Sequence, residues 1–97
     1  MRILAMEYDL KPVPGDAHDD VLRREAGAVW SLQQRSVIRE VYLTEAATKA
    51  VLLLECDSVE EAKKHLAGLP LVSEGYCDFK LYPLEPYPGF SRLFADG

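Results

Sequence analysis

Apolar and polar residues alternate with a period of two in four segments of the chain, the pattern of β-strands whose two faces meet different surroundings. The segments span residues 2–10, 37–43, 49–56 and 76–84. The third contains the run VLLLEC, which is almost continuously apolar and is typical of a strand covered on both sides. A short polar link joins the second and third segments, so this pair predicts a hairpin.

Helical spacing replaces the alternation in residues 17–35. Apolar side chains recur there every three or four positions and predict one stripe, formed by Val21, Leu22, Ala26, Val29 and Trp30. Asp16 is the expected N-cap, and the acids after it lie in the first turn, where the helix dipole favours negative charge.

A second helix is expected to begin after Ser58, because Ser58 and Glu61 have the spacing of a capping box. Gly68 is expected to end this helix in the left-handed conformation, and Pro70 to prevent its continuation.

The predicted order is therefore β-α-β-β-α-β, the ferredoxin-like unit of the α+β class. Right-handed crossovers give an antiparallel sheet in the strand order 4-1-3-2, with both helices on one face. Cys56 and Cys77 fall on the third and fourth strands, which are not neighbours in this order, so we expect reduced, packed thiols. We expect residues 1–97 to form a single domain.

Helices on one face leave the other face of the sheet bare. Soluble monomers rarely expose an apolar patch of more than a few hundred Å², so we expect a second copy of the sheet, related by a two-fold axis, to cover it. The tail, residues 84–97, adds four large apolar side chains with no place in one protomer: Tyr87, Phe90, Leu93 and Phe94. We expect the tail to pack across the dimer.

Charge and composition narrow the partners. The net charge is −5 and the eleven basic residues are scattered, which argues against nucleic acid. No apolar run approaches the roughly 20 residues that span a bilayer, and the N-terminus lacks the pattern of a signal peptide. We therefore expect a soluble, cytoplasmic protein. Helix capping explains the acids around His18, so we expect no metal site there.

The segment SVEEAKKHLAGLPLVSEGYCDFKLYPL resembles the closing half of muconolactone isomerase-like proteins, in the dimeric α+β barrel superfamily. The shared features are the Ser-Val-Glu start of the second helix, Leu69-Pro70-Leu71 after it, and a strand with Asp78-Phe79. The resemblance implies a homodimeric barrel that moves a proton in a small lactone without cofactor or metal. Where these isomerases carry Trp and His around a Gly, this chain has Arg39, Glu40 and Tyr42.

Candidate site residues follow from a ligand cleft between the sheet and the helices. Tyr8 is a phenol donor and Trp30 a stacking surface, or both are aromatic core. His65, beside the apolar face of the second helix, is an acid or base, or a surface histidine near Lys63 and Lys64.

Arg39 is a further candidate. If its face is the helix-covered one, it binds a substrate carboxylate or forms an ion pair with Glu55. We predict Tyr8, Arg39, Tyr42 and His65 as catalytic residues, and Met6, Trp30 and Phe79 as ligand-binding residues.

The predicted function is binding of a small, partly apolar organic molecule, with cofactor-independent isomerisation by proton transfer if the protein is an enzyme. Two alternatives stay open. One is a non-catalytic binding or assembly module, in which the polar groups would be paired or exposed and no pocket would exist. The other is a cofactor-free oxygenase or cyclase, which would need a deeper cleft around Trp30.

Overall fold

Four antiparallel strands form one sheet in the order β2-β3-β1-β4, which is the predicted order read from the other edge. In this computed structural model, which describes residues 1–94, the central strands are β1 (Arg2–Asp9) and β3 (Ala50–Glu55), and the edge strands are β2 (Ile38–Leu43) and β4 (Cys77–Leu84). β1 pairs with β3 and β4, with Leu4 opposite Leu53 on one side and Tyr82 on the other. The ferredoxin-like topology is confirmed.

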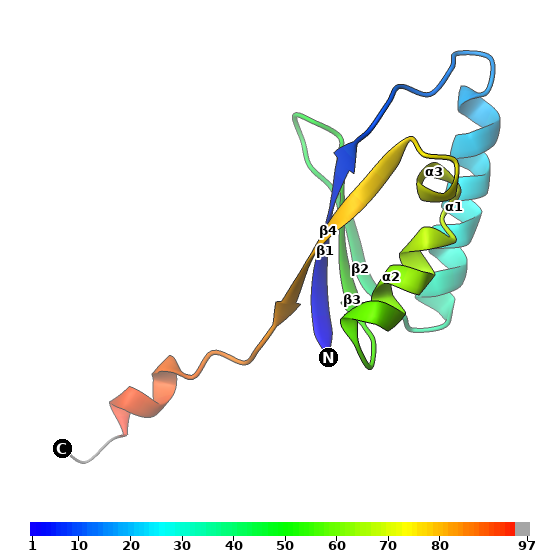
Figure 1. Ribbon diagram of the computed structural model, residues 1–97. Helices are drawn as coiled ribbons and strands as arrows, with labels where there is room; N and C mark the ends of the chain where they lie inside the picture. Colours follow the sequence, from blue (N-terminus) through cyan, green and yellow to red (C-terminus); the bar gives the residue numbers. More distant parts are fainter. Residues whose placement is uncertain (95–97) are drawn as a thin grey trace.

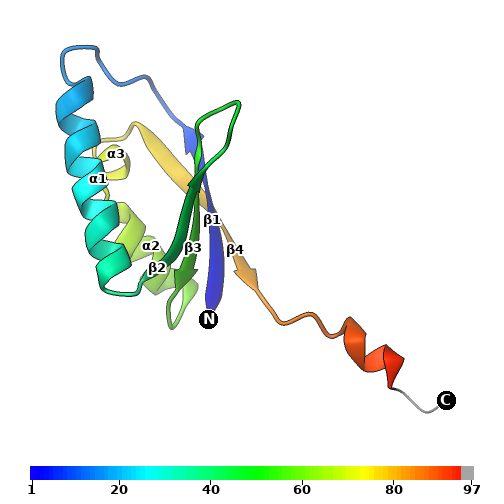
Figure 2. The same cartoon turned by 180° about the vertical axis from the view of Figure 1, so that it is seen from behind.

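All three helices cover the same face of the sheet (Figure 1; Figure 2). They are α1 (His18–Gln34), α2 (Val59–Ala67) and the short α3 (Pro70–Ser73). A 3-10 helix, η1 (Gly89–Leu93), follows β4 in the tail. Among residues 1–94, no helix is both long enough and apolar enough to cross a membrane.

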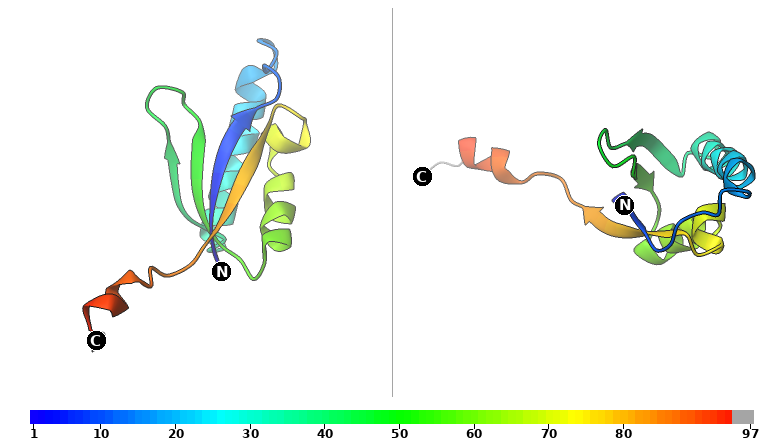
Figure 3. Two further views of the ribbon diagram at one scale, coloured as in Figure 1. Left: turned by 60° about the vertical axis from the view of Figure 1, so that its left-hand side comes forward. Right: turned by 90° about the horizontal axis from the view of Figure 1, so that it is seen from above.

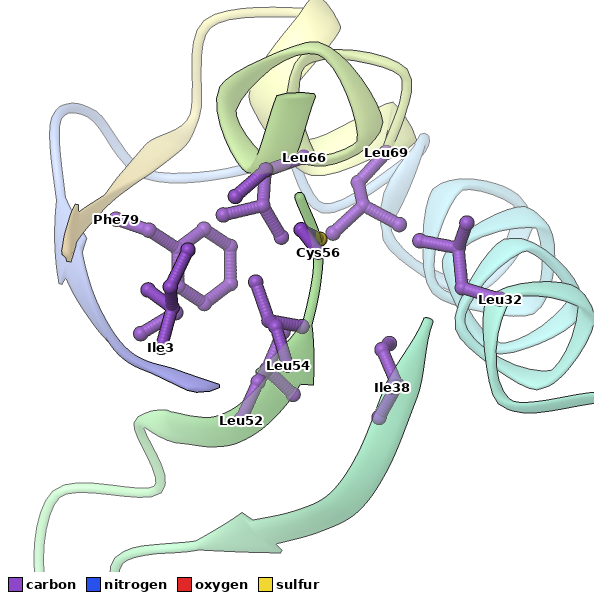
Figure 4. Packing of buried hydrophobic residues seen from close by; sticks show 11 residues of the cluster. Ile3, Leu32, Ile38, Leu52, Leu54, Cys56, Leu66, Leu69 and Phe79 are labelled. Atoms are coloured by element: carbon purple, nitrogen blue, oxygen red, sulfur yellow. The ribbon is translucent and has the colours of Figure 1, made fainter. Parts of the chain in front are cut away.

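The core lies between the sheet and the helices (Figure 4). Alternate residues of the two central strands face it: β1 contributes Ile3 and Ala5, and β3 contributes Leu52 and Leu54, each at most 1% exposed. Phe79 from β4, Leu66 from α2 and Leu69 before α3 close over them. Burying each such aliphatic side chain contributes about 1.5–3 kcal/mol, so this layer holds the fold together.

β2 contains a β-bulge, and the bulge changes which of its side chains face the helices compared with the prediction. The pairing with β3 shifts between Ile38 and Glu40, so Arg39 has no partner in the ladder. Ile38 is 1% exposed and lies in the core with the helix-covered face, whereas the alternation had put it on the side of Glu40.

The ends of the helices also differ from the prediction in part. Ser58 caps α2 as expected, since its Oγ accepts from the Glu61 amide at 3.1 Å and the Glu61 carboxylate accepts from the Asp57 amide at 2.7 Å. Asp16 does not cap α1, because the N-cap is Ala17, which has no side chain to accept a hydrogen bond.

The end of α2 differs as well. Gly68 has a φ of −83° and is right-handed, so it is not the left-handed cap that we expected. The chain turns at Leu69 and starts α3 with Pro70 at its first turn, where the missing amide hydrogen costs nothing. The left-handed glycine is Gly75, with a φ of 83°, in the turn between α3 and β4.

Both cysteines are free and buried, as predicted. Cys56 directly follows β3 and Cys77 begins β4, and β1 lies between these strands in the sheet.

Candidate functional site

A cleft of about 1020 Å³ lies between α1 and the helix-covered face of the sheet. Its walls come from the end of β1 and the segment after it, the inner side of α1, the β2–β3 hairpin, and the start of β4. The cleft is thus at the end of the sheet where β1 finishes and β4 begins. A filled core had been the expectation for a pure assembly module, so the cleft favours a binding site.

The sides of the cleft are mostly apolar because α1 does not press its whole apolar stripe against the sheet. Val21 and Leu32 are the buried residues of α1. Leu22, Val29 and Trp30 instead line the cleft, and Trp30 is 63% exposed. Opposite them, the sheet contributes Val41, Leu43, Leu52 and Phe79. Apolar side chains therefore line the cleft on both its helix side and its sheet side.

Glu25 brings a carboxylate into these apolar surroundings. It lies on α1 and is only partly exposed, and its Oε1 accepts a hydrogen bond from the Leu71 amide at 2.9 Å. Burial raises the pKa of Glu25 above its ordinary value, and the nearby charge of Glu7 raises it further, while the bond from Leu71 lowers it. Among residues 1–94, no donor of the chain reaches the other oxygen of this carboxylate.

α3 fixes the position of Glu25. Besides the Leu71 amide, α3 is tied to α1 by Arg24, whose Nη1 contacts the Glu74 carboxylate at 2.6 Å while its Nε contacts Asp20 at 3.0 Å. The guanidinium of Arg24 lowers the pKa of Glu74. The pair is exposed, so it orients the helices more than it stabilises them.

Glu7, on β1, is the second carboxylate of the cleft. Its Oε1 accepts from the Ala50 amide at 2.7 Å, which anchors it to β3. Burial and a hydrogen bond to Glu7 raise the pKa of the Cys77 thiol to about 12. Cys77 therefore stays protonated at neutral pH and is no nucleophile, because the thiolate is the reactive form.

The rim of the cleft carries the charged pairs. Lys49 Nζ contacts Asp9 Oδ2 at 2.6 Å, and this hydrogen bond raises the pKa of Lys49. The Lys11 ammonium lies 5.2 Å from the centre of the Tyr76 ring. His18, at the start of α1, also lines the cleft. Within residues 1–94, no group of three or more His, Cys, Asp or Glu side chains has the arrangement of a metal site.

Comparison by sequence finds no relative: no protein-family model matches the chain, and no curated protein matches it. Comparison by structure does find proteins with this fold. Among solved structures, muconolactone isomerase matches with a TM-score of 0.77 and 21% identity, over 91% of this chain and 92% of that one. The chain folds like muconolactone isomerase.

A second solved structure with this fold is 5-chloro-2-hydroxyhydroquinone dehydrochlorinase (TftG) from Burkholderia phenoliruptrix AC1100, in complex with 2,5-dihydroxybenzoquinone. Its TM-score is 0.64 at 18% identity, over 88% of this chain and 94% of that one. The resemblance to the muconolactone isomerase fold inferred from the sequence is confirmed. At these identities the likeness concerns the fold.

Of the residues predicted for the site, Trp30 and Phe79 line the cleft. Met6, Tyr8 and Tyr42 do not, because their positions in the strands turn them to the face of the sheet that the helices leave bare. Tyr8 is 45% exposed there, and Tyr42 donates to the Glu40 carboxylate at 2.6 Å, which raises the pKa of Tyr42. The alternation of apolar and polar residues revealed the strands, but it did not indicate which face of each strand the helices would cover.

Arg39 and His65 also lie away from the cleft. Arg39 is exposed in the bulge, and its Nε donates to the Ser36 carbonyl at 3.0 Å. The predicted pairing of Arg39 with Glu55 is wrong, since Glu55 accepts from the amino group of Met1 at 2.7 Å and from Arg2 at 3.3 Å. His65 lies 3.7 Å from Glu61 and lines a smaller groove of about 280 Å³ between α1 and α2.

The sequence reasoning missed both carboxylates of the cleft, although each left a signal. Glu7 continues the Ile3–Ala5 side of β1, which is the core side. Glu25 lies four residues after Val21 and four before Val29, so it shares their side of the helix. An acid in register with core residues is the pattern that would have found them.

Proposed function

We propose that the chain binds a small, partly apolar organic molecule in the cleft and that Glu25 transfers a proton on it without a cofactor. The observation that carries the proposal is a partly buried carboxylate whose pKa burial raises, with one oxygen held by the Leu71 amide, on the wall of a large apolar cleft. Tuned carboxylates of this kind serve as general acids and bases near neutral pH.

In the proposed reaction, the free oxygen of Glu25 takes a proton from a carbon next to a carbonyl group of the bound molecule. The electron pair of the broken C–H bond moves into an enolate, and the protonated Glu25 returns the proton at another carbon of the same conjugated system. Nothing is oxidised or reduced, so no cofactor is needed. Lys49, at the rim, supplies positive charge for the enolate oxygen.

The other groups of the cleft have supporting roles in this proposal. Trp30 and Phe79 hold the apolar body of the molecule. Glu7, fixed by the Ala50 amide, keeps the pKa of Glu25 raised by its charge. The proposed reaction gives no role to the four residues predicted as catalytic from the sequence, Tyr8, Arg39, Tyr42 and His65.

Two kinds of molecule suit these walls: unsaturated five-membered lactones, and hydroquinones or quinones. The first follows from the resemblance to muconolactone isomerase, and the second from the molecule bound to the dehydrochlorinase, 2,5-dihydroxybenzoquinone. Both are small and flat, and both carry carbonyl or enol groups within a conjugated system.

Binding is tested first, by thermal unfolding with each class of molecule. A ligand at about five times its Kd adds about 1 kcal/mol to the free energy of unfolding, which raises the Tm of a domain of this size by about 4–8 °C. Trp30→Ala should abolish the shift. If no member of either class raises the Tm, the proposed ligand classes are wrong.

Proton transfer is tested by the uptake of deuterium from D2O into the bound lactone, followed by NMR. Glu25→Gln keeps the shape and the acceptor for the Leu71 amide but removes the base, so the exchange rate should fall by about 10²–10⁴-fold. Glu45→Gln, an exposed glutamate in the hairpin, is the matched control and should not change the rate. Binding by the native chain without any exchange would leave a binding protein and remove the reaction.

A further inference from the structure

Tyr76 places a phenol on the wall of the cleft. It lies in the turn between α3 and β4, directly before Cys77. Within residues 1–94, its hydroxyl makes no hydrogen bond, and no buried side-chain oxygen or nitrogen is left without a partner, so this hydroxyl is accessible. A phenol in mostly apolar surroundings can donate a hydrogen bond to a molecule that binds there.

Backbone hydrogen bonds hold Tyr76 from two neighbouring segments. Its amide donates to the Leu71 carbonyl at 2.9 Å, and its carbonyl accepts from the amides of Leu10 at 2.9 Å and Lys11 at 3.3 Å. The segment after β1 and the turn between α3 and β4 therefore lie side by side at one end of the sheet (Figure 1; Figure 3). A donor fixed in this way needs no rearrangement at the moment of reaction.

Leu71 fixes Tyr76 and Glu25 together. The Leu71 amide donates to Oε1 of Glu25 at 2.9 Å, and the carbonyl of the same residue accepts from the Tyr76 amide at 2.9 Å. One residue of α3 thus sets the positions of a carboxylate from α1 and of a phenol from the start of β4. A reaction that moves a proton and charge within one bound molecule requires such a fixed relation between base and donor.

Lys11 adds a positive charge beside the phenol. Its ammonium lies 5.2 Å from the centre of the Tyr76 ring. A Cβ built on Gly75 would lie 3.7 Å from the Lys11 Nζ, so the ammonium also lies close to the turn that precedes Tyr76. A phenol that donates to an anion gains negative charge on its own oxygen and ring, and a cation over the ring stabilises this charge. Lys11 therefore makes Tyr76 a better donor to an anionic oxygen.

Other donors of the cleft already have partners in the chain. The Lys49 ammonium donates to Asp9 at 2.6 Å, and the Thr48 hydroxyl donates to the Ala47 carbonyl at 2.7 Å. Lys49 thus offers positive charge from the rim, but the structure commits one of its hydrogen bonds to Asp9. The Tyr76 hydroxyl has no such commitment, and it is tied to the same residue as Glu25.

We propose that the Tyr76 hydroxyl donates to the carbonyl oxygen of the bound molecule and stabilises the enolate, with Lys11 as a positioning residue that supports it through the ring. This inference rests on the proposed function, because Glu25 forms the enolate. As Glu25 takes the proton from carbon, the electron pair of the C–H bond moves toward the carbonyl oxygen, and the hydrogen bond from Tyr76 strengthens. Tyr76 keeps its own proton, so the return of the proton from Glu25 to another carbon restores both side chains.

Tyr76→Phe tests the donor, because it keeps the ring and removes only the hydroxyl. The rate of deuterium exchange into the bound lactone should fall by about 10²–10³-fold, the usual effect of losing one donor to a developing oxyanion. The Kd of the lactone should stay close to the native value, since a neutral carbonyl accepts a weaker hydrogen bond than an enolate does. Weaker binding with an unchanged rate at saturation would overturn the catalytic role of Tyr76.

Tyr82→Phe is the matched control. Tyr82 is also on β4, and the Lys80 ammonium lies 5.8 Å from the centre of its ring. It follows Phe79 by three positions in the strand, so it lies on the opposite face of the sheet from the cleft. Tyr82→Phe should therefore leave both the exchange rate and the Kd unchanged. An equal loss of rate in Tyr76→Phe and Tyr82→Phe would overturn the inference.

The part played by Lys11 is tested by a pair of substitutions. Lys11→Met should lower the exchange rate by about 2–5-fold, whereas Lys11→Arg, which keeps a charge over the ring, should restore it. In the Tyr76→Phe variant, Lys11→Met should cause no further loss, because the charge acts through the hydroxyl. The same loss with and without the hydroxyl would overturn the role of Lys11.

Binding of 4-nitrophenolate tests the donor without any reaction. This flat anion imitates the enolate, and Glu25→Gln imitates the protonated Glu25 that accompanies it. Adding Tyr76→Phe to Glu25→Gln should weaken the binding of 4-nitrophenolate by about 10–10²-fold, the usual worth of a hydrogen bond to a charged group. It should also shift the absorption maximum of the bound anion. Equal affinities with and without the hydroxyl, or no binding at all, would overturn the inference.

The two proposals fail in different ways. If the native protein catalyses exchange and Tyr76→Phe does so at the native rate, the role of Tyr76 is wrong and the proposed function stands. If the native protein exchanges no lactone but holds 4-nitrophenolate through the Tyr76 hydroxyl, the proposed reaction is wrong, and Tyr76 remains the donor to an oxyanion in the cleft.

Discussion

The two halves of the helix-covered face are built from the same sheet but are filled very differently. Under α2, the core is closed: Leu66 and Leu69 pack on β1 and β3. The longer helix α1 has 17 residues against 9 in α2, and much of its apolar stripe faces a cleft of about 1020 Å³. A helix can thus have an apolar face that it does not bury against the sheet. The half of the molecule under α1 loses the stabilisation that this burial would give, and it is the half with room for a ligand.

The sharpest test of this contrast is the same substitution in each half. Leu54→Ala, at a fully buried core position, should lower the free energy of unfolding by about 2–5 kcal/mol, because it leaves a cavity. Leu43→Ala, at the cleft rim and 67% exposed, should cost less than about 1 kcal/mol. Urea unfolding measures both. Equal losses would mean that the cleft is closed in solution by the chain itself.

The caps of the two helices give a smaller difference. Ser58→Ala removes the bond to the Glu61 amide and should cost about 1 kcal/mol. Asp16→Ala should change stability by less than about 0.5 kcal/mol, since Asp16 does not cap α1. Thermal unfolding of both variants checks this pair, and a large loss with Asp16→Ala would show that α1 begins earlier than described.

The smallest effect concerns Glu25 and depends on pH. Because burial raises the pKa of Glu25 in the folded state, the folded protein holds this proton at pH values where the unfolded chain has lost it. The contribution of Glu25 to stability therefore falls as the pH rises above the ordinary pKa of 4.5. Glu25→Gln should match the native Tm at pH 4 and exceed it by a few degrees at pH 7. A Tm difference that does not grow with pH would contradict the burial of this charge.

Local patterns in the sequence predicted most of the fold. The alternation of the four strands, the capping box at Ser58 and the helical stripe of α1 act between near neighbours in the chain, and each corresponds to an element in the structure. The strand order followed from these elements and from the handedness of crossovers. There are two exceptions. At Arg39 the pairing of β2 with the distant strand β3 shifts, and at Gly68 the backbone stays right-handed before the chain turns into α3.

The candidate site was harder to foresee, because it depends on which side of each strand the helices cover. The sequence by itself determined the elements, their order, the free cysteines and the apolar surplus of the tail, since these follow from neighbours along the chain. Only the tertiary structure decided that Tyr8 and Tyr42 face away from the cleft and that Glu7 and Glu25 face into it. The physical reason is that α1 and α3 are held at their positions by contacts over long sequence separations, such as Glu25 with Leu71 and Arg24 with Glu74, which no periodicity records.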